Sequence, residues 1–330
     1  MKAIYDILIY ILSILKETEL KQIYIQKNAK SLSEYLTGSY PLLKPGTLNK
    51  FLRNNKIKVN GKKLPLSTPL AKGDVISLYI DDSWFEKPEK NNAFKFSGKN
   101  LEIIYEDENL LVVNKPAGIP VMDDNWQNFD TLINRVKNHY FSNNIPVSPA
   151  LCHRLDTGTQ GLVMIAKNED FLQFMLEMFR DKNLEKEYIC VVKGIPEKKK
   201  ALYSAYLTKN AKQGYVTVSE KSRGSLSKPI QTHVSVIESY GDFSLLKIGL
   251  ITGRTHQIRA HLAYLGMPVL GDSRYGINSL NRQLKLKYQL LCSHKITFSR
   301  VGSTKYSYLS GKSFVCPDPW FVESFNKREF

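Results

Sequence analysis

The sequence has few cysteines, and their placement argues against two common kinds of site. The 330 residues contain four of them, Cys152, Cys190, Cys292 and Cys316. They lie far apart and form no C-x-x-C pair, so their spacing predicts neither a metal knuckle nor a disulfide framework. A reducing compartment is the simplest expectation for such a chain, and we expect no bound metal.

Long apolar runs are also missing. The best candidate, residues 7–15, follows Asp6 and is closed by charged residues from Lys16 onward. It is too short to span a bilayer, and no small-residue cleavage site follows it. We interpret residues 1–20 as an apolar N-terminal extension, either an extra docking helix or an over-long start. The sequence therefore predicts a cytoplasmic protein that does not enter a membrane.

Acidic residues are scarce relative to basic ones: 31 Asp and Glu stand against 47 Lys and Arg, for a net charge of +16. Residues 21–80 alone carry eleven basic residues and two acidic ones, Glu34 and Asp74. Both nucleic acid and a membrane surface attract basic proteins. An excess concentrated in one segment favours nucleic acid over a merely solvated surface.

The length predicts about two domains. Residues 21–80 form a small module, in which Leu48, Phe51 and Leu52 share one helix face and the Asn60-Gly61 pair marks a tight turn. The polar residues 81–100 are interpreted as a linker. Residues 101–330 form a larger domain. Its strands and helices intermix without regular alternation, which predicts an α+β fold with a mixed sheet.

Hydrophobic spacing in the larger domain predicts particular elements. Residues 162–166 and 187–192 are expected to be strands, and residues 258–265 a helix that ends at Gly266. Phe171, Phe174, Met175 and Met178 recur at helical spacing. We expect an amphipathic helix there, with its methionines in the core rather than in a cofactor site.

Two segments concentrate the side chains that can perform chemistry. Residues 152–161, CHRLDTGTQG, place an imidazole, a guanidinium and a carboxylate within four residues, just before a predicted strand. Residues 252–261, TGRTHQIRAH, form the second segment. Taken alone, Asp156 would be interpreted as a turn cap paired with Arg154. A carboxylate at a loop end beside a strand is also where a rigid scaffold carries catalysis.

Together these segments resemble the second and third motifs of the Rlu-type (RluA family) RNA pseudouridine synthases. Residues 105–121, YEDENLLVVNKPAGIPV, resemble the first motif of that family, and residues 186–194, KEYICVVKG, its short tyrosine motif. The third motif continues to residue 276, and residues 21–80 resemble the S4-like RNA-binding domain. The resemblance implies a pseudouridine synthase fold with a mixed, largely antiparallel central sheet.

The resemblance implies that a uridine already in RNA is isomerised: its base leaves the N-glycosidic bond, rotates and re-attaches through carbon 5. Asp156 matches the family's catalytic aspartate. It either attacks the sugar or assists base departure by electrostatics and proton abstraction at the 2′ position. Arg259 matches the arginine expected to pair with Asp156. Tyr188 matches a tyrosine whose ring can stack on uracil and whose hydroxyl can act as a general base or a donor. This chemistry requires no cofactor.

Three residues are expected to bind the substrate. Arg154 matches the arginine expected to fill the space of the flipped base, which offsets part of the cost of unstacking. Arg254 lies in the third motif. Lys115 ends a predicted strand, where it serves the architecture or contacts a phosphate.

The histidines of the two segments are interpreted as hydrogen-bonding scaffold. His256 and His261 are five residues apart, which is not the i, i+4 spacing of a zinc pair on a helix. His153 belongs to the same group. Asp272, in the Gly-Asp turn of the third motif, is expected to be structural. Leu291–Lys295 matches only loosely the Leu-His-Ala segment of the family.

The sequence thus predicts a monomeric RNA pseudouridine synthase. Large-subunit ribosomal RNA is favoured as substrate because the basic N-terminal module accompanies the ribosomal enzymes. The alternatives are a transfer-RNA pseudouridine synthase and a non-catalytic RNA-binding or ribosome-assembly protein. A metal-dependent nuclease is disfavoured, because the sequence lacks the clustered carboxylates that such sites need.

Overall fold

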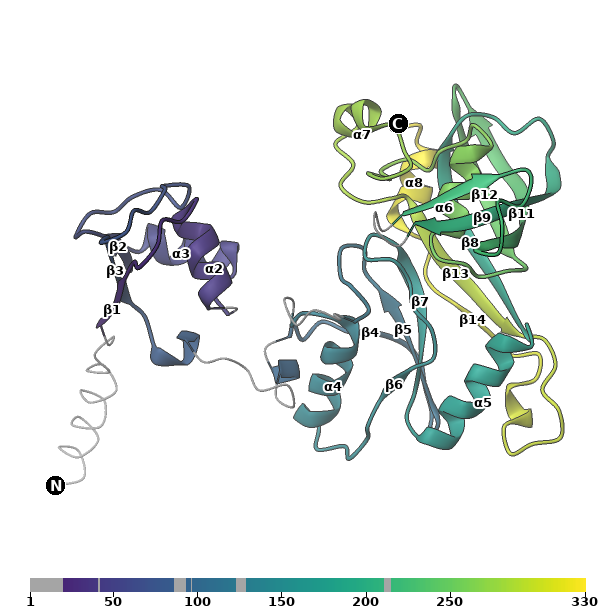
Figure 1. Cartoon of the computed structure of the whole chain (residues 1–330). Coiled ribbons are helices and arrows are strands. Elements are labelled where there is room, and N and C mark those ends of the chain that lie inside the picture. The colour runs from purple at the N-terminus through teal and green to yellow at the C-terminus, as the bar shows by residue number, and fades with distance from the viewer. Residues whose placement is uncertain (1–19, 41, 86–92, 96, 123–128, 211–214) are drawn as a thin grey trace. The chain divides into compact units, whose positions relative to one another are not determined.

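The computed structural model describes residues 20–40, 42–85, 93–95, 97–122, 129–210 and 215–330. The chain divides between residues 96 and 97 into two compact units, here called the small and the large unit (Figure 1). The predicted extension, residues 1–20, lies outside the described residues except for Leu20. Within the described residues, no helix is long and apolar enough to cross a membrane.

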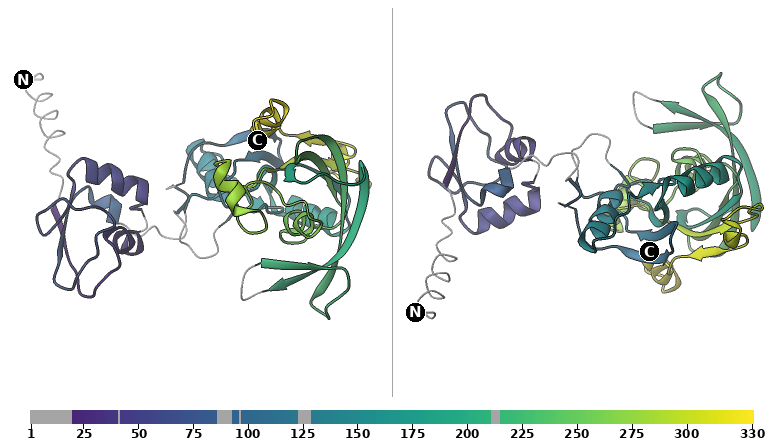
Figure 2. Two further views of the ribbon diagram at one scale, coloured as in Figure 1. Left: turned by 90° about the horizontal axis from the view of Figure 1, so that it is seen from above. Right: turned by 90° about the horizontal axis from the view of Figure 1, so that it is seen from below.

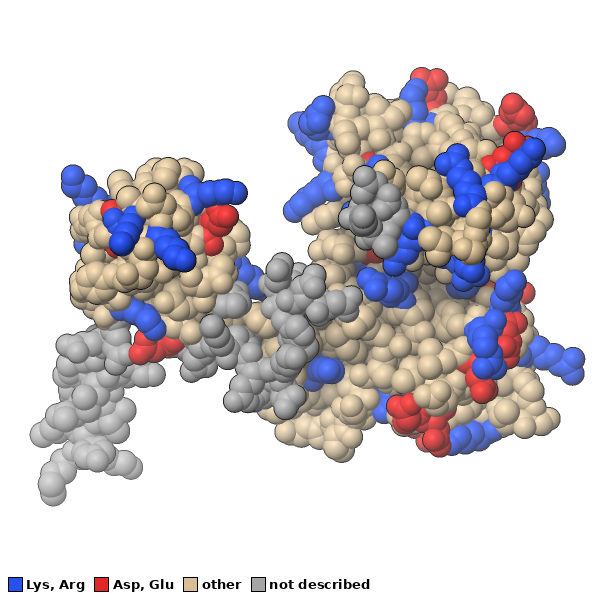
Figure 3. Space-filling model, in the orientation of Figure 1, with Lys and Arg blue, Asp and Glu red and all other residues tan. Residues whose placement is uncertain are grey.

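The small unit packs two helices, α2 (Leu32–Ser39) and α3 (Pro45–Arg53), on a sheet of order β1-β3-β2. Its strands are β1 (Leu20–Tyr24), β2 (Ile57–Val59) and β3 (Val75–Tyr79). Proline at the first position of α3 suits a helix start, since its missing N–H has no partner there anyway. Asn60 and Gly61 both have positive φ and close the predicted tight turn. Figure 3 shows Lys and Arg side chains over the visible face of this unit.

Each end of the predicted linker, residues 81–100, belongs to a different unit. A short 3-10 helix, η1 (Asp82–Phe85), packs Trp84 against Phe51 and Phe85 against Tyr40 in the small unit. At the other end, the backbone N–H of Gly98 donates to Asp130 of the large unit at 2.9 Å. The structure therefore assigns both ends of the expected linker to folded units.

The large unit is built on one sheet of order β10-β9-β11-β12-β8-β13-β7-β5-β4, with β14 beside β13 and β6 beside β7. Neighbouring strands pair antiparallel except β7 and β13, which pair in parallel. The predicted α+β fold with a mixed, largely antiparallel sheet is confirmed. The strands are β4 (Glu102–Glu106), β5 (Leu110–Lys115), β6 (Ala150–Leu151), β7 (Gln160–Ala166), β8 (Leu184–Lys193), β9 (Lys200–Asn210), β10 (Tyr215–Ser219), β11 (Ser227–Tyr240), β12 (Phe243–Leu250), β13 (Leu291–Phe298) and β14 (Ser313–Val315).

Helices cover both faces of this sheet (Figures 1 and 2). On one face, α4 (Leu132–Ser142) and α6 (Gln257–Tyr264) contribute to a core with alternate residues of the strands. On the other, α5 (Glu169–Arg180) and α8 (Trp320–Asn326) do the same. The short helix α7 (Asn278–Gln283) follows α6. The amphipathic helix predicted around residues 171–178 is confirmed: Phe171, Met175 and Met178 are buried in the core.

Three residues form one row across the middle of the sheet. Ser293 of β13 pairs with Tyr188 of β8 on one side and with Gly161 of β7 on the other. Gly161 has a φ of +112°, and a Cβ there would collide with the backbone of Ser293. Only glycine lets the two strands approach this closely. Because β7 follows directly on residues 152–159, this junction places the first chemical segment beside Tyr188.

The separate cores of the two units generate a prediction about RNA binding. Removing residues 1–96 should leave a folded large unit that binds RNA more weakly and with a shallower salt dependence. Each lost phosphate contact removes about 0.7–0.9 from the slope of log affinity against log salt. The measurement is RNA affinity from low to high salt.

A full-length variant with Lys50→Gln and Arg53→Gln provides the control. It removes two exposed charges of α3 without removing the unit, so its slope should fall between the other two. Equal slopes for the full-length and shortened proteins would show that the small unit does not touch RNA.

Candidate active site

The guanidinium of Arg259, in α6, joins two carboxylates. Its Nε and Nη2 donate to the two oxygens of Asp272, at 2.7 and 2.9 Å, and its Nη1 donates to Oδ2 of Asp156 at 2.7 Å. The side chain of Asp272 is fully buried, while that of Asp156 is 26% exposed. The predicted pairing of Arg259 with Asp156 across 103 residues is confirmed.

The sequence did not reveal how closely Asp272 is involved. This carboxylate also accepts hydrogen bonds from the backbone N–H groups of Arg274 and Tyr275. Despite its burial, the hydrogen bonds and charge of Arg259 hold the pKa of Asp272 below its usual range. Asp272 is therefore a structural residue, as expected, but its structural task is to fix the guanidinium that holds Asp156.

The second oxygen of Asp156 is the less constrained one. Among the residues that the structure describes, Oδ1 accepts no hydrogen bond, and Nε2 of His256 lies 3.7 Å from it. The other ring nitrogen of His256 shares a hydrogen bond of 3.0 Å with the hydroxyl of Tyr275. Burial, opposed by the charge of Asp156, lowers the pKa of His256. A neutral imidazole thus faces the carboxylate, and Oδ1 remains available to a substrate.

Lys115 supports the Asp156 loop from beneath. Its ammonium donates to the carbonyl oxygens of Pro116, Ile119 and Thr157 at 2.8–3.2 Å, and its side chain is fully buried. Burial lowers the pKa of Lys115 to about 7. These buried contacts favour the architectural role expected of Lys115 over a phosphate contact.

Gln257, the first residue of α6, binds the loop before this helix and the neighbouring strand β11. Its side-chain oxygen accepts from the hydroxyl of Thr252 and from the backbone N–H of Arg254, and its nitrogen donates to Gln231 and Thr232 of β11. These bonds hold the start of the helix, so that Arg259 enters the site from its first turns.

Tyr188 lies beside this ion pair, in the row that also holds Ser293. Its side chain is buried among residues of the sheet and α6. Burial, opposed by Ser293 and assisted by the nearby charge of Asp156, raises the pKa of Tyr188 to about 12. The phenol is therefore protonated at neutral pH and can donate a hydrogen bond.

The remaining predicted residues divide into exposed arginines and inward histidines. Arg154 and Arg254 are exposed. His153 accepts from the backbone N–H of Met164, and His261 shares a hydrogen bond with Thr232. Burial lowers the pKa of both histidines to about 4. The histidine scaffold is confirmed.

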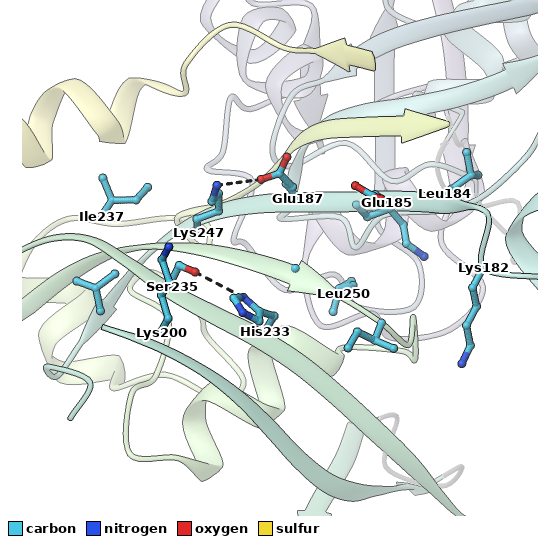
Figure 4. Close-up of a pocket in the computed structure, with 14 residues that line it drawn as sticks. Lys182, Leu184, Glu185, Glu187, Lys200, His233, Ser235, Ile237, Lys247 and Leu250 are labelled. Atoms are coloured by element: carbon cyan, nitrogen blue, oxygen red, sulfur yellow. Dashed lines mark hydrogen bonds and ion pairs between the residues drawn. The ribbon is translucent and has the colours of Figure 1, made fainter. Parts of the chain in front are cut away.

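A separate cavity of about 760 Å³, whose lining includes neither Asp156 nor Tyr188, is shown in Figure 4. Its lining comes mainly from β8, β11 and β12. Lys247 of β12 lines the cavity, whereas its neighbour Ile248 packs with α6. Because neighbouring residues of a strand point to opposite faces of the sheet, the cavity opens on the face opposite to Ile248. Glu187 pairs with Lys247 at 3.2 Å inside it. Its other basic residues are Lys182, Lys186 and Lys200.

Comparison with known proteins gives consistent matches. A family model described as RNA pseudouridylate synthase matches residues 109–264. The chain is 32% identical over 323 residues to the ribosomal large subunit pseudouridine synthase D of Borreliella burgdorferi, covering 94% of each. It is 32% identical over 295 residues to the ribosomal large subunit pseudouridine synthase C of Rickettsia bellii, covering 82% of this chain and 90% of that one. A structure of human RNA pseudouridylate synthase domain containing 1 matches with a TM-score of 0.55 and 25% identity, covering 67% of this chain and 85% of that one.

The buried ion pair between Arg259 and Asp272 predicts an effect of mutation on the free energy of unfolding. Asp272→Asn should lower the free energy of unfolding by about 3 kcal/mol, because it leaves the guanidinium of Arg259 with less charge compensation in a buried place. The control is Asp242→Asn, which removes an exposed carboxylate paired with Lys193 and should cost under about 0.5 kcal/mol. Urea unfolding of the three proteins measures both changes, and equal losses would contradict a fork that depends on Asp272.

Proposed function

Since the chain belongs to the RNA pseudouridylate synthase family and isomerises uridine to pseudouridine in RNA, we propose that its substrate is ribosomal RNA of the large subunit. The observation that carries this proposal is the extent of the match. Relatives named for that substrate align over 94% and 82% of this chain. We propose further that the protein acts as a monomer in the cytoplasm.

We propose that Asp156 is the catalytic carboxylate. In the reaction the bond from carbon 1′ to N1 breaks, a bond from carbon 1′ to carbon 5 forms, the proton on carbon 5 leaves and N1 gains one. The departing base needs a fixed negative charge near the sugar. Arg259 holds one oxygen of Asp156 and leaves Oδ1 free to face the sugar. Attack on carbon 1′ and proton abstraction at the 2′ position both use this oxygen.

The ionisation state of Tyr188 favours one of its two expected roles. A phenol whose pKa is about 12 is a poor general base at neutral pH and a competent donor. We propose that its hydroxyl donates to the uracil as the base departs, and that its ring packs against the base.

The basic residues around the site are proposed to hold the flanking RNA. Arg154 and Arg254 are exposed beside the catalytic pair, so their guanidinium groups can meet phosphates or fill the space of the flipped base. The small unit adds a further basic surface.

Mapping pseudouridines in cellular RNA with and without this gene tests the substrate. The proposal predicts the loss of one or more pseudouridines from large-subunit ribosomal RNA. Losses confined to transfer RNA would overturn the ribosomal assignment and favour the transfer-RNA alternative. No loss in any RNA would support a non-catalytic role.

Asp156→Asn should abolish pseudouridine formation while RNA affinity and stability change little. The amide has the same shape but brings no charge to the sugar. Release of tritium from RNA labelled on uracil carbon 5 measures turnover, with Asp242→Asn as the control that removes a remote, exposed carboxylate. Retention of even a few per cent of wild-type turnover would show that Asp156 is not essential.

Tyr188→Phe separates the hydroxyl from the ring. Turnover should fall about 100-fold, the usual loss when one donor to developing charge is removed, with RNA affinity preserved because the ring remains. Single-turnover rates at saturating RNA measure the effect. Full activity of this variant would restrict Tyr188 to packing or stacking.

A further inference from the structure

A second cluster of reactive side chains lies in the large unit, apart from the catalytic pair. It consists of Cys292 and His294 of β13 and Cys316, which directly follows β14. The backbone N–H of Cys316 donates to the carbonyl of His294 at 3.0 Å, which continues the pairing of the two strands. The pairing of β13 with β8 shifts register between Ser293 and Lys295, so His294 is the extra residue of a bulge. Bulges commonly re-aim a side chain toward a site.

The distances within this cluster fit one ion. The two sulfur atoms lie 3.5 Å apart, and Sγ of Cys316 lies 3.8 Å from Nδ1 of His294. All three ligand atoms lie within 4.8 Å of one another. A tetrahedral zinc ion with bonds of about 2.3 Å to sulfur and about 2.0 Å to nitrogen places two sulfur atoms roughly 3.8 Å apart and a sulfur roughly 3.5 Å from the nitrogen. Two edges of the triangle therefore lie within about 0.3 Å of the length that zinc requires.

A carboxylate lies near the ring nitrogen of His294 that faces away from the cysteines. Its second ring nitrogen, Nε2, faces Oδ1 of Asp318 at 3.7 Å. A histidine that binds a metal usually gives its other N–H to a carboxylate or carbonyl, which fixes the ring and the tautomer. Cys292 and Cys316 are buried, whereas the His294 side chain is 19% exposed. An ion could therefore reach the cluster from solvent on the side of His294.

We propose that Cys292, His294 and Cys316 bind a zinc ion, with water as the fourth ligand and Asp318 orienting His294. Two thiolates and one imidazole are a donor set that zinc accepts. The sequence spacing predicts no such site, because 24 residues separate the cysteines and only the pairing of β13 with β14 joins them. The ion would fasten β14 and the chain leading to α8 onto the centre of the sheet. It would take no part in the chemistry at Asp156.

Cobalt binding to the reduced, chelator-treated full-length protein tests the proposal. One equivalent of Co²⁺ should give the near-ultraviolet charge-transfer absorption of a thiolate–cobalt bond, and zinc should displace it. Cys292→Ser and Cys316→Ser should each abolish the band. His294→Gln and Asp318→Asn, at partly exposed positions, should weaken zinc affinity about 10-fold or more. Zinc should raise the Tm of the wild type by about 2–4 °C, and that of His294→Gln by less.

The matched controls are Cys152→Ser and Cys190→Ser, which alter the two buried cysteines outside the cluster. Both should retain the cobalt band at full strength. Absence of the band in the wild type, or the same zinc affinity in the wild type and His294→Gln, would overturn the proposal. A Cys292–Cys316 disulfide in protein purified without reductant, together with no metal uptake after reduction, would overturn it as well.

Discussion

The arrangement of the active site depends on the buried guanidinium of Arg259. Two of its N–H groups donate to Asp272, whose own position is set by backbone N–H groups. A third N–H group therefore already donates to Asp156 before any substrate binds. One carboxylate oxygen is thereby held and the other left free. A charge fixed in this way needs no reorganisation during the reaction, which is the main electrostatic advantage of an enzyme site over water. Lysine could not replace Arg259, because a single ammonium group cannot reproduce the planar set of hydrogen bonds that the guanidinium makes to two carboxylates.

The sheet brings the members of this site together at the junction of β7 and β13. The parallel pairing there requires Gly161, and it sets the Asp156 loop in line with Ser293 and Tyr188. Lys115, at the end of β5, then holds this loop through the carbonyl of Thr157, while its other two bonds go to the carbonyls of Pro116 and Ile119. The carboxylate of Asp156 is therefore carried on a loop whose two sides are anchored in the core. The proposed zinc site lies on the far side of β13 from Tyr188 and would stiffen the same strand.

Much of this could be predicted from sequence where the signal is local. The helix around Phe171 to Met178 and the strand that ends at Ala166 followed from the pattern of apolar residues alone. The Asp156–Arg259 pair followed from the family motifs. The inward direction of Lys115 and the bidentate contact of Asp272 did not, because each depends on a tertiary contact, with the carbonyl of Thr157 and with the side chain of Arg259. The proximity of Cys292 to Cys316 is of the same kind: strand pairing creates it, and no periodicity records it.

The central claim is that Arg259 aims one oxygen of Asp156 at the sugar of a flipped uridine. A crystal structure of the protein with RNA that carries an unreactive uridine analogue tests it most directly. The account predicts Oδ1 of Asp156 about 3–3.5 Å from the sugar carbon 1′ or the 2′ position, with the bond from Arg259 to Oδ2 intact and the uracil against Tyr188. A uridine bound with Asp156 beyond contact distance of its sugar, or Arg259 turned from Asp156 to a phosphate, would contradict the account.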